Sequence, residues 1–157
     1  MIATPIRLTR YMARDPMPKR RHTWRQKVRI YDRDSGACHK FYIDFGEYED
    51  GRLGEVFITS HRHGTFVRGT LDTLARTISI ALQSGTSPAE VARSLLGQNY
   101  PPSGRVDAEG SEVTECLSVA DYLGQEIDRC YGEDGRRRPI TPPPEKSAGY
   151  ISDGSGV

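Results

Sequence analysis

The chain has 157 residues, which suits one domain of about 100–200 residues and is too short for a barrel enzyme. Hydrophobic residues make up only 36%, below the roughly 45–50% apolar share of ordinary globular domains, so we expect part of the chain to lie outside any core. The formal net charge of +1 gives no reason to expect nucleic acid or a membrane as the main partner.

The cysteines and the opening residues indicate the compartment. Cys38, Cys116 and Cys130 are odd in number and far apart, which argues against a disulfide framework and a zinc ribbon. No residue that would activate a thiolate stands next to them, so we expect structural cysteines rather than nucleophiles. The opening residues lack the apolar run of a secretory signal, and no stretch approaches the roughly 20 apolar residues of a membrane span. We therefore expect a cytoplasmic protein with reduced thiols and no metal or cofactor.

The small net charge hides a strong asymmetry along the chain. Residues 1–33 carry ten Lys and Arg against two Asp, a sum of +8, so the remainder sums to −7. Residues 1–24 are therefore interpreted as a basic arm. Such an arm can dock on the acidic body of its own or a neighbouring subunit. It can equally bind an anionic ligand, because guanidinium groups form paired hydrogen bonds with phosphate.

Alternating apolar residues predict three strands after the arm. Charged and apolar residues alternate from Arg25 onward, and His39–Phe45 repeats that period of two. A polar turn at Asp32–Gly36 separates these strands, and a third strand follows at Glu55–Ser60. The sequence thus predicts an antiparallel meander, which needs a cover on its apolar face to be stable.

Helical periodicity supplies that cover. Leu71–Leu82 spaces its apolar residues at the helical period, and Ser87–Glu90 is a capping box that opens a short helix through Leu96. Asn99–Gly110 is rich in Pro and Gly and is expected to be a loop. A long helix is predicted over about 111–131, because its apolar residues form one stripe.

We therefore predict an α+β fold over residues 25–131, a small antiparallel sheet of three or more strands packed against two or three helices. The basic arm of residues 1–24 precedes this domain. Residues 132–157 lack core residues and are expected to form a disordered tail.

The segment after the third strand offers two kinds of site. His61 and His63 place two imidazoles on one side of a strand end, but zinc needs three or four ligands and no third is near, so a surface loop is favoured over a metal site. The stretch Gly64–Thr70 runs into a helix start, where unpaired N–H groups and the helix dipole suit an anion. Arg68 could add a donor there.

Other candidates are weaker. Arg76 lies two turns after Arg68 on the same helix, where a solvated face is the simpler interpretation. Tyr100 and Arg105 belong either to a phosphate-binding lid or to a plain connection. Four acids could be imagined as paired general acid and base, but a turn between strands predicts that they are exposed. They are Glu47, Glu49, Asp50 and Glu55.

Several segments between Pro18 and Tyr131 match one known family. The most specific is Gly46–Ile58, with the sequence GEYEDGRLGEVFI. The others are Gln26–Ile30, Phe41–Ile43, Thr65–Gly69, Ala81–Gly85, Pro102–Gly104 and Asp121–Leu123. In these segments the chain resembles the C-terminal, TSCPD-type region of cobalamin-dependent (class II) ribonucleotide reductases.

The resemblance does not extend to catalysis. Those reductases carry their radical cysteine and cobalamin site in a large barrel that this chain cannot contain, and the terminal CxxC pair and the TSCPD signature are both missing here. The resemblance therefore implies a freestanding module, a small sheet backed by helices, without reductase activity. In outline it is also similar to viral nucleotide-sequestering proteins such as the Thoeris anti-defence sponges, which bind cyclic signalling nucleotides without cleaving them.

We expect a non-catalytic, oligomeric binding module that holds or sequesters a phosphate-bearing small molecule, a nucleotide or a cyclic nucleotide signal. Exposed sheet edges and the long last helix predict a homo-oligomer. One alternative is a protein-interaction module that docks on a ribonucleotide reductase or another host enzyme. A further alternative is a nucleotide phosphodiesterase using the two histidines. The expected ligand-binding residues are Arg20, Arg21, Trp24, Arg25, His61, His63, Arg68, Arg76, Tyr100 and Arg105.

Overall fold

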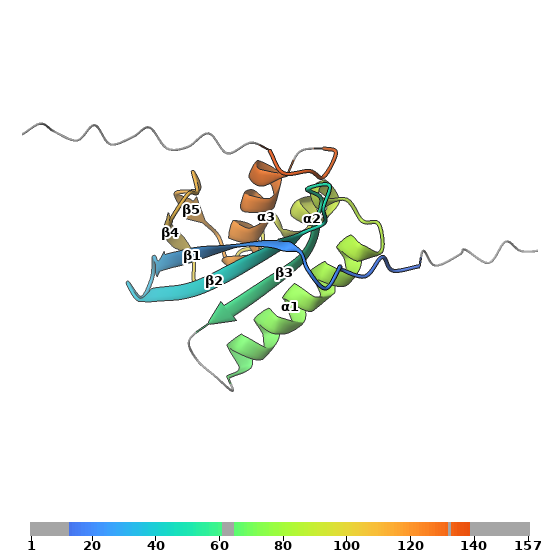
Figure 1. Ribbon diagram of the computed structural model, residues 1–157. Coiled ribbons are helices and arrows are strands. Elements are labelled where there is room, and N and C mark those ends of the chain that lie inside the picture. Colours follow the sequence, from blue (N-terminus) through green and yellow to red (C-terminus); the bar gives the residue numbers. More distant parts are fainter. Residues whose placement is uncertain (1–12, 61–64, 132, 139–157) are drawn as a thin grey trace, which may run out of the picture.

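The computed structural model of the chain describes residues 13–60, 65–131 and 133–138 (Figure 1). Within these residues five strands form one sheet in the order β3–β2–β1–β4–β5, and three helices accompany it. Every neighbouring pair of strands is antiparallel. The predicted α+β class is therefore confirmed, with two strands beyond the predicted meander.

The predicted meander consists of β1 (His22–Asp32), β2 (Cys38–Glu47) and β3 (Leu53–Ser60). Successive side chains of a strand point to opposite faces of the sheet. Every second residue over Gln26–Asp32 is accordingly buried, and β2 repeats this alternation over Phe41–Phe45. One face of the sheet is therefore apolar and covered, and the other carries the charged residues.

Asp32 fixes the turn between β1 and β2. Its carboxylate accepts hydrogen bonds from the Ser35 hydroxyl at 2.6 Å, from the Ser35 N–H at 3.0 Å and from the Ser103 N–H at 3.1 Å. These bonds, with that of the Ser35 hydroxyl foremost, lower the pKa of Asp32 to about 2. The carboxylate thus joins the predicted hairpin turn to the chain that enters β4.

The predicted loop at Asn99–Gly110 was wrong, because it contains β4 (Gly104–Ala108), which pairs with β1. This short strand has only one buried apolar side chain, Val106, so its sequence shows no alternating pattern. The surrounding Pro and Gly residues are typical of a loop. Gly104 has φ +152°, and a Cβ there would lie 2.3 Å from the Tyr31 carbonyl oxygen. The glycine therefore permits the close approach of β4 to β1.

The last helix begins later than predicted. Residues 111–118 are not helical: β5 (Glu115–Cys116) pairs with β4, and α3 spans Val119–Cys130. Ser118 is the N-cap, and its side chain accepts the Asp121 N–H at 3.0 Å. This capping pattern, Ser followed three residues later by an acid, indicates the true start of the helix. The prediction missed it because the apolar stripe continues further toward the N-terminus.

The other two helices follow the sequence more closely. Helix α1 spans Phe66–Gln83 and begins before the predicted Leu71, because its first turn is largely exposed and lies outside the apolar period. Helix α2 spans Pro88–Leu95, and both hydrogen bonds of the predicted capping box at Ser87 and Glu90 are present.

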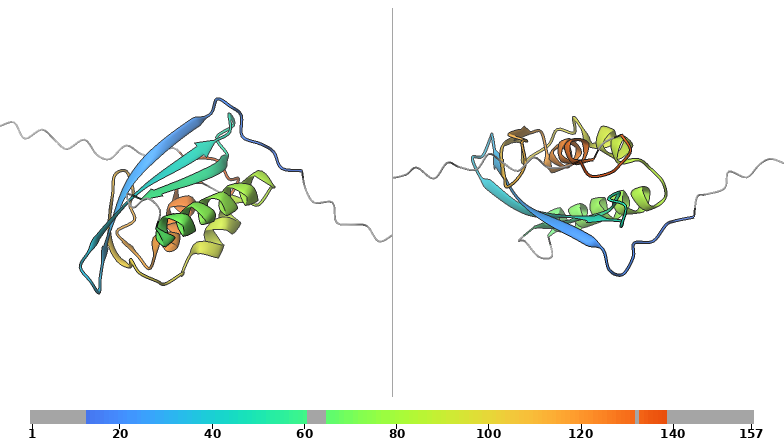
Figure 2. Two further views of the ribbon diagram at one scale, coloured as in Figure 1. Left: turned by 90° about the horizontal axis from the view of Figure 1, so that it is seen from below. Right: turned by 45° about the horizontal axis from the view of Figure 1, so that its top comes forward.

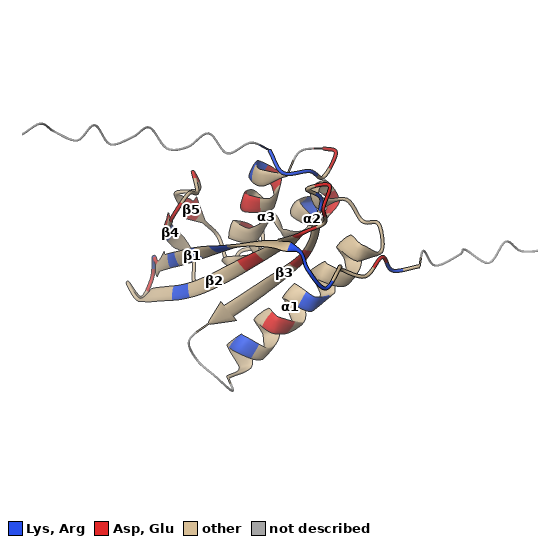
Figure 3. Cartoon of the chain, in the orientation of Figure 1, with Lys and Arg blue, Asp and Glu red and all other residues tan. Residues whose placement is uncertain are grey.

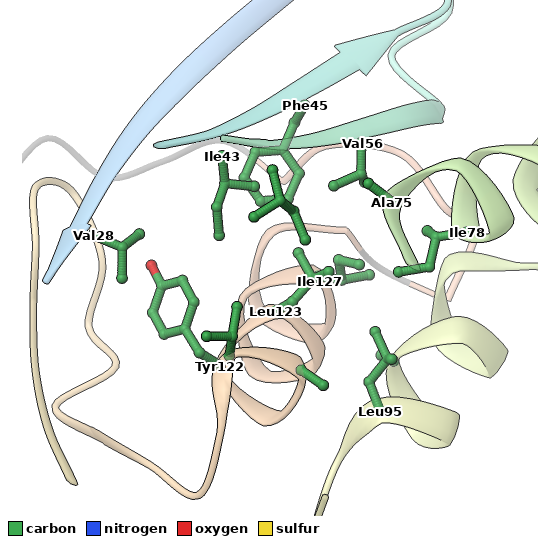
Figure 4. Close-up of a cluster of buried hydrophobic side chains, with 14 of the residues drawn as sticks. Val28, Ile43, Phe45, Val56, Ala75, Ile78, Leu95, Tyr122, Leu123 and Ile127 are labelled. Atoms are coloured by element: carbon green, nitrogen blue, oxygen red, sulfur yellow. The ribbon is translucent and has the colours of Figure 1, made fainter. Parts of the chain in front are cut away.

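The three helices cover different parts of the sheet (Figure 2). Helices α2 and α3 lie over the inner face of the sheet, while α1 runs alongside β3. Figure 4 shows the resulting core, in which side chains from the sheet and from all three helices meet. The side chains labelled there are Val28, Ile43, Phe45, Val56, Ala75, Ile78, Leu95, Tyr122, Leu123 and Ile127.

Side chains of α1 cap the outer edge of β3. The Val56 N–H donates to the Ser79 hydroxyl at 3.0 Å, and this hydroxyl lies 3.2 Å from the Val56 carbonyl. The Gln83 amide donates to the Gly54 carbonyl at 2.9 Å. Edge strands invite pairing with other chains when their backbone groups are open. The edge is therefore closed at Gly54 and Val56, so the expectation that an open sheet edge drives association does not hold for this part of β3.

Residues near both ends of the described chain contact Arg52. Its guanidinium lies 3.9 Å from the Asp15 carboxylate, and its backbone forms a β-bridge with Arg136. Residues 133–138, at the start of the expected tail, also bond to the domain through the Arg137 N–H to the Gly51 carbonyl at 3.0 Å. Residues beyond 138 lie outside the described part of the chain.

Replacing the edge cap tests its role in stability. We expect Ser79→Ala to lower the free energy of unfolding by about 1–3 kcal/mol, because the buried Val56 N–H loses its partner. Ser94→Ala is the matched control, since Ser94 is exposed and bonds only within α2, and we expect a change within about 0.5 kcal/mol. Urea unfolding followed by circular dichroism measures both. Equal midpoints for the two variants would contradict the capping role.

Candidate binding surface

The structure does not gather the predicted ligand-binding residues into one pocket. Arg20, Arg21, Trp24 and Arg25 lie at the start of β1, whereas Arg105 lies opposite Tyr31. Tyr31 lies ten positions after Arg21 along extended chain, about 33 Å at roughly 3.3 Å per residue.

The remaining predicted residues lie elsewhere. Arg68 and Arg76 are on α1, and Tyr100 is an exposed residue after α2. His61 and His63 lie outside the described residues. At the predicted anion seat before α1, the Thr65 side chain itself accepts the Arg68 N–H at 3.3 Å. That N–H group is therefore already used by the helix cap.

Several of the predicted arginines are paired with acids of the same chain. Arg25 forms two hydrogen bonds with Asp44, at 2.7 and 2.9 Å, and these raise the pKa of Arg25. Arg21 pairs with Glu55, and Arg76 pairs with Asp72 at 3.1 Å. Because these cations already have anionic partners, a phosphate would have to displace a carboxylate to bind them.

Trp24 is a structural anchor of the sheet. Its ring stacks on Phe45 with centroids 4.2 Å apart, and the Arg137 guanidinium lies 5.0 Å from the ring centroid. Its N–H donates to Glu47 at 3.1 Å and lies 3.2 Å from the Tyr131 hydroxyl. A ring with these contacts stabilises the fold, although the sequence predicted a ligand-binding residue.

The prediction that the acids around the second turn are exposed was wrong for Glu47 and Glu55, which are 5% and 6% exposed. Glu47 accepts hydrogen bonds from Trp24 and, at 2.8 Å, from the Tyr131 hydroxyl, and its other oxygen lies 3.0 Å from His22 Nδ1. These partners offset the cost of burying the charge. Sequence reasoning missed this because Tyr131 is 84 residues away along the chain.

A second buried carboxylate, Glu126, has no exposed surface and was not singled out from the sequence. It accepts hydrogen bonds from Arg129 at 2.5 Å, Ser111 at 2.7 Å and Gln26 at 3.1 Å. Burial alone would raise its pKa, but these three donors outweigh burial and lower the pKa of Glu126. The sequence held one signal of a buried polar partner, Gln26, which is a polar residue at an inward position of β1.

The buried thiols are poorly suited to chemistry. Burial raises the pKa of Cys116 to about 11 and that of Cys130 to about 12, so both are protonated at neutral pH. Cys38 is exposed at the start of β2, and all three cysteines are unpaired. Within the described ranges no three His, Cys, Asp or Glu side chains are grouped so as to hold a metal ion.

The outer face of the sheet is the surface that gathers cations and aromatic rings. We define the outer face by Lys27, Arg29, Tyr31, Lys40, Tyr42 and Arg105, which alternate with the buried residues of β1, β2 and β4. Figures 1 and 2 show α2 and α3 on the opposite side of the sheet, and Figure 3 shows the basic positions along β1 and β2.

The strand register brings these side chains together. Lys27 lies directly opposite Tyr42, and Arg29 lies directly opposite Lys40. Side chains opposite each other on one face have Cβ atoms about 4.5–5.5 Å apart, and diagonal neighbours are about 7–8 Å apart. The three cations therefore form one cluster beside Tyr42. The Arg105 guanidinium lies 4.2 Å from the centroid of the Tyr31 ring at the far end of the same face.

Carboxylates neutralise only part of this face. Arg29 pairs with Asp107 at 3.0 Å. Neither Lys27 nor Lys40 has an ion pair among the residues that the structure describes. Two lysines, one arginine and an aromatic ring thus share one exposed face, an arrangement that suits an anion carrying a planar group.

The fold and the matched sequence define the class of protein. A family model for the TSCPD domain matches residues 11–131, and the chain belongs to this family. The resemblance that the sequence indicated is therefore confirmed.

Curated relatives of the chain carry the name vitamin B12-dependent ribonucleotide reductase. The chain is 33% identical over 118 residues to the protein of Bradyrhizobium diazoefficiens and 30% identical over 118 residues to that of Agrobacterium fabrum. Each match covers 75% of this chain but only 9% of the relative. A third, from Rhodopirellula baltica, is 29% identical over 71% of this chain and 10% of the relative. The chain therefore spans about a tenth of the length of these proteins.

No solved structure matches the chain significantly. Among the described residues, every helix is too short or too polar to cross a bilayer.

Thiol titration tests the assignment of the cysteines. At pH 8 we expect a thiol reagent to modify one cysteine per folded chain, Cys38, and three after unfolding in urea, because burial keeps the other two protonated and covered. The Cys38→Ser variant should show no rapid reaction when folded. Rapid modification of two or three thiols in the folded chain would contradict the structural role of Cys116 and Cys130.

Proposed function

We propose that the chain is a non-catalytic binding module whose outer face holds a phosphate-bearing small molecule, a nucleotide or a cyclic nucleotide. The observation that carries this proposal is the cluster of half-buried Lys27, Arg29 and Lys40 around Tyr42, on a sheet face that no helix of the described residues covers. The ligand is the one expected from the sequence, but most of the binding residues differ. Of the expected ligand-binding residues, Arg105 and Arg25 lie on this side of the sheet, and Arg25 is paired with Asp44 and lies 5.7 Å from the centroid of the Tyr42 ring.

The binding mode follows from the chemistry of the face. The two lysines act as point charges toward phosphate, and Arg29 offers a planar fork of N–H donors. The phenol ring of Tyr42 gives a base a flat surface to stack on. The Tyr31 ring, against which the Arg105 guanidinium lies, is four residues beyond Lys27 on the same face of β1. Exposed charges are screened by salt, so we expect affinity to fall as ionic strength rises.

Binding without turnover is supported by the state of the reactive groups. The buried carboxylates Glu47 and Glu126 are saturated by hydrogen bonds within the fold, and the buried thiols are protonated. A protein that retains a nucleotide unchanged acts by sequestration, which needs only affinity and abundance. The rival phosphodiesterase function depends on His61 and His63, outside the described residues.

Calorimetric titration with nucleotides and cyclic dinucleotides at low salt tests this proposal. We expect the double variant Lys27→Ala with Lys40→Ala to weaken binding at least about tenfold, since each lost phosphate contact removes charge-assisted bonds. The control, Lys19→Ala with Arg93→Ala, removes two exposed cations away from the outer face and should bind as the parent does.

Two results would contradict the proposal. One is the absence of heat with every nucleotide at about 100 µM, which corresponds to a binding free energy weaker than about 5.5 kcal/mol. The other is equal weakening in both double variants. Recovery of the intact nucleotide after heat denaturation separates retention from cleavage.

The family relation favours a second candidate function. Because the relatives carry this module within ribonucleotide reductases about ten times its length, the chain is a candidate for docking on such an enzyme. We expect it to comigrate in gel filtration with the Bradyrhizobium diazoefficiens reductase from which the matching region has been deleted, and not with the intact reductase. Separate elution in both mixtures would contradict docking.

A further inference from the structure

Helix α1 has an uncharged side that faces away from the rest of the protein. Its buried residues, such as Leu71, Ala75 and Leu82, lie on one side of the helix. About half a turn around, at 3.6 residues per turn, the opposite side carries no charged residue. We call this side the α1 stripe, and it consists of Phe66, Gly69, Thr70, Thr73, Thr77 and Ile80.

The α1 stripe is apolar in character and exposed. Phe66 is 88% exposed and Ile80 is 50% exposed, which is unusual for large apolar residues on a solvent-facing helix side. The hydroxyls of Thr73 and Thr77 donate to carbonyls of their own helix at 2.9 Å, so these threonines can present their methyl groups outward. A shallow groove of about 580 Å³ runs along the stripe from Phe66 to Thr77.

The order of residues in the α1 stripe is symmetric about Thr73. Phe66 and Ile80 are each seven residues from Thr73, and Gly69 and Thr77 are each four residues from it. Two copies packed antiparallel about Thr73 would therefore place Phe66 of each copy against Ile80 of the other. The small residues between them would let the two helices approach closely.

The charges beside the stripe fit the same arrangement. Asp72 and Arg76 flank the stripe and form an ion pair at 3.1 Å. In the antiparallel arrangement, Arg76 of one copy would lie about two residues, or about 3 Å along the helix, from Asp72 of the other. Each carboxylate would thus gain a second cation, so the charges of the two copies are complementary.

Two of the surfaces expected to associate are used within the chain. The edge of β3 is capped by Ser79 and Gln83, and nine of the twelve residues of α3 are buried within the domain. We propose that α1 pairs antiparallel with α1 of a second copy of this chain, with Thr73 on the two-fold axis. This pairing does not depend on nucleotide binding by the outer face.

The size of the stripe sets the expected strength of the pairing. An 18-residue helix is about 27 Å long and about 10 Å wide, so the stripe covers on the order of 300 Å² in each copy. A standard interface buries about 800 Å² in each partner. We therefore expect a dimer that forms at high protein concentration and dissociates on dilution.

Sedimentation equilibrium between about ten micromolar and about one millimolar tests the pairing. The parent chain and the control Ser94→Arg, which adds a charge to the exposed side of α2, should approach the mass of a dimer at the upper end. Thr73→Arg should stay monomeric, because it places like charges face to face on the axis. A monomeric parent at every concentration, or a dimer unaffected by Thr73→Arg, would overturn the proposal.

Cross-linking tests the axis itself. In a Cys38→Ser background, oxidation of Thr73→Cys should give a disulfide-linked dimer, because a residue on a two-fold axis meets its own copy. Helix axes packed about 9–10 Å apart leave facing Cα atoms about 4.4–5.4 Å apart, within the range that a disulfide spans. Ser94→Cys should not cross-link under the same conditions. Equal cross-linking of both variants would overturn the proposed axis, and circular dichroism checks that each variant is folded.

Discussion

Burial of one face of a twisted sheet is the constraint on which the other features depend. Phe45 and Ile43 lie at the centre of this face, and α2 and α3 are held against it. Because α1 covers the edge at β3, its own far side has no partner among the described residues. Within the same part of the chain no helix lies over the opposite face of the sheet, so both candidate binding surfaces result from how the core is closed.

The buried carboxylates of Glu47 and Glu126 stabilise the fold. Glu47 joins the start of β1 to Tyr131 after α3, and Glu126 joins Gln26 of β1 to α3. Each carboxylate is held by several hydrogen bonds within the fold. These bonds offset the desolvation cost of burying the charges.

Local patterns in the sequence predicted those elements that have many residues to display their period. The eleven residues of β1 and the capping box of α2 are examples. The five residues of β4 contain too few inward positions to be recognised, and the start of α3 depends on a cap that an apolar stripe concealed. The candidate site was harder to predict, because the cluster of Lys27, Arg29 and Lys40 exists only through the register between β1 and β2. Arginines prominent in the sequence, such as Arg25, are neutralised by cross-strand acids that no local pattern reveals.

The contact of Arg52 with both Asp15 and Arg136 has a consequence for how this unit combines with other proteins. The chain enters and leaves the folded unit within the reach of one side chain. Units with adjacent entry and exit can be inserted into a loop of a host protein without pulling that loop apart. The same geometry favours circular permutation, in which residues 15 and 136 are joined by a linker and new ends are opened in an exposed turn.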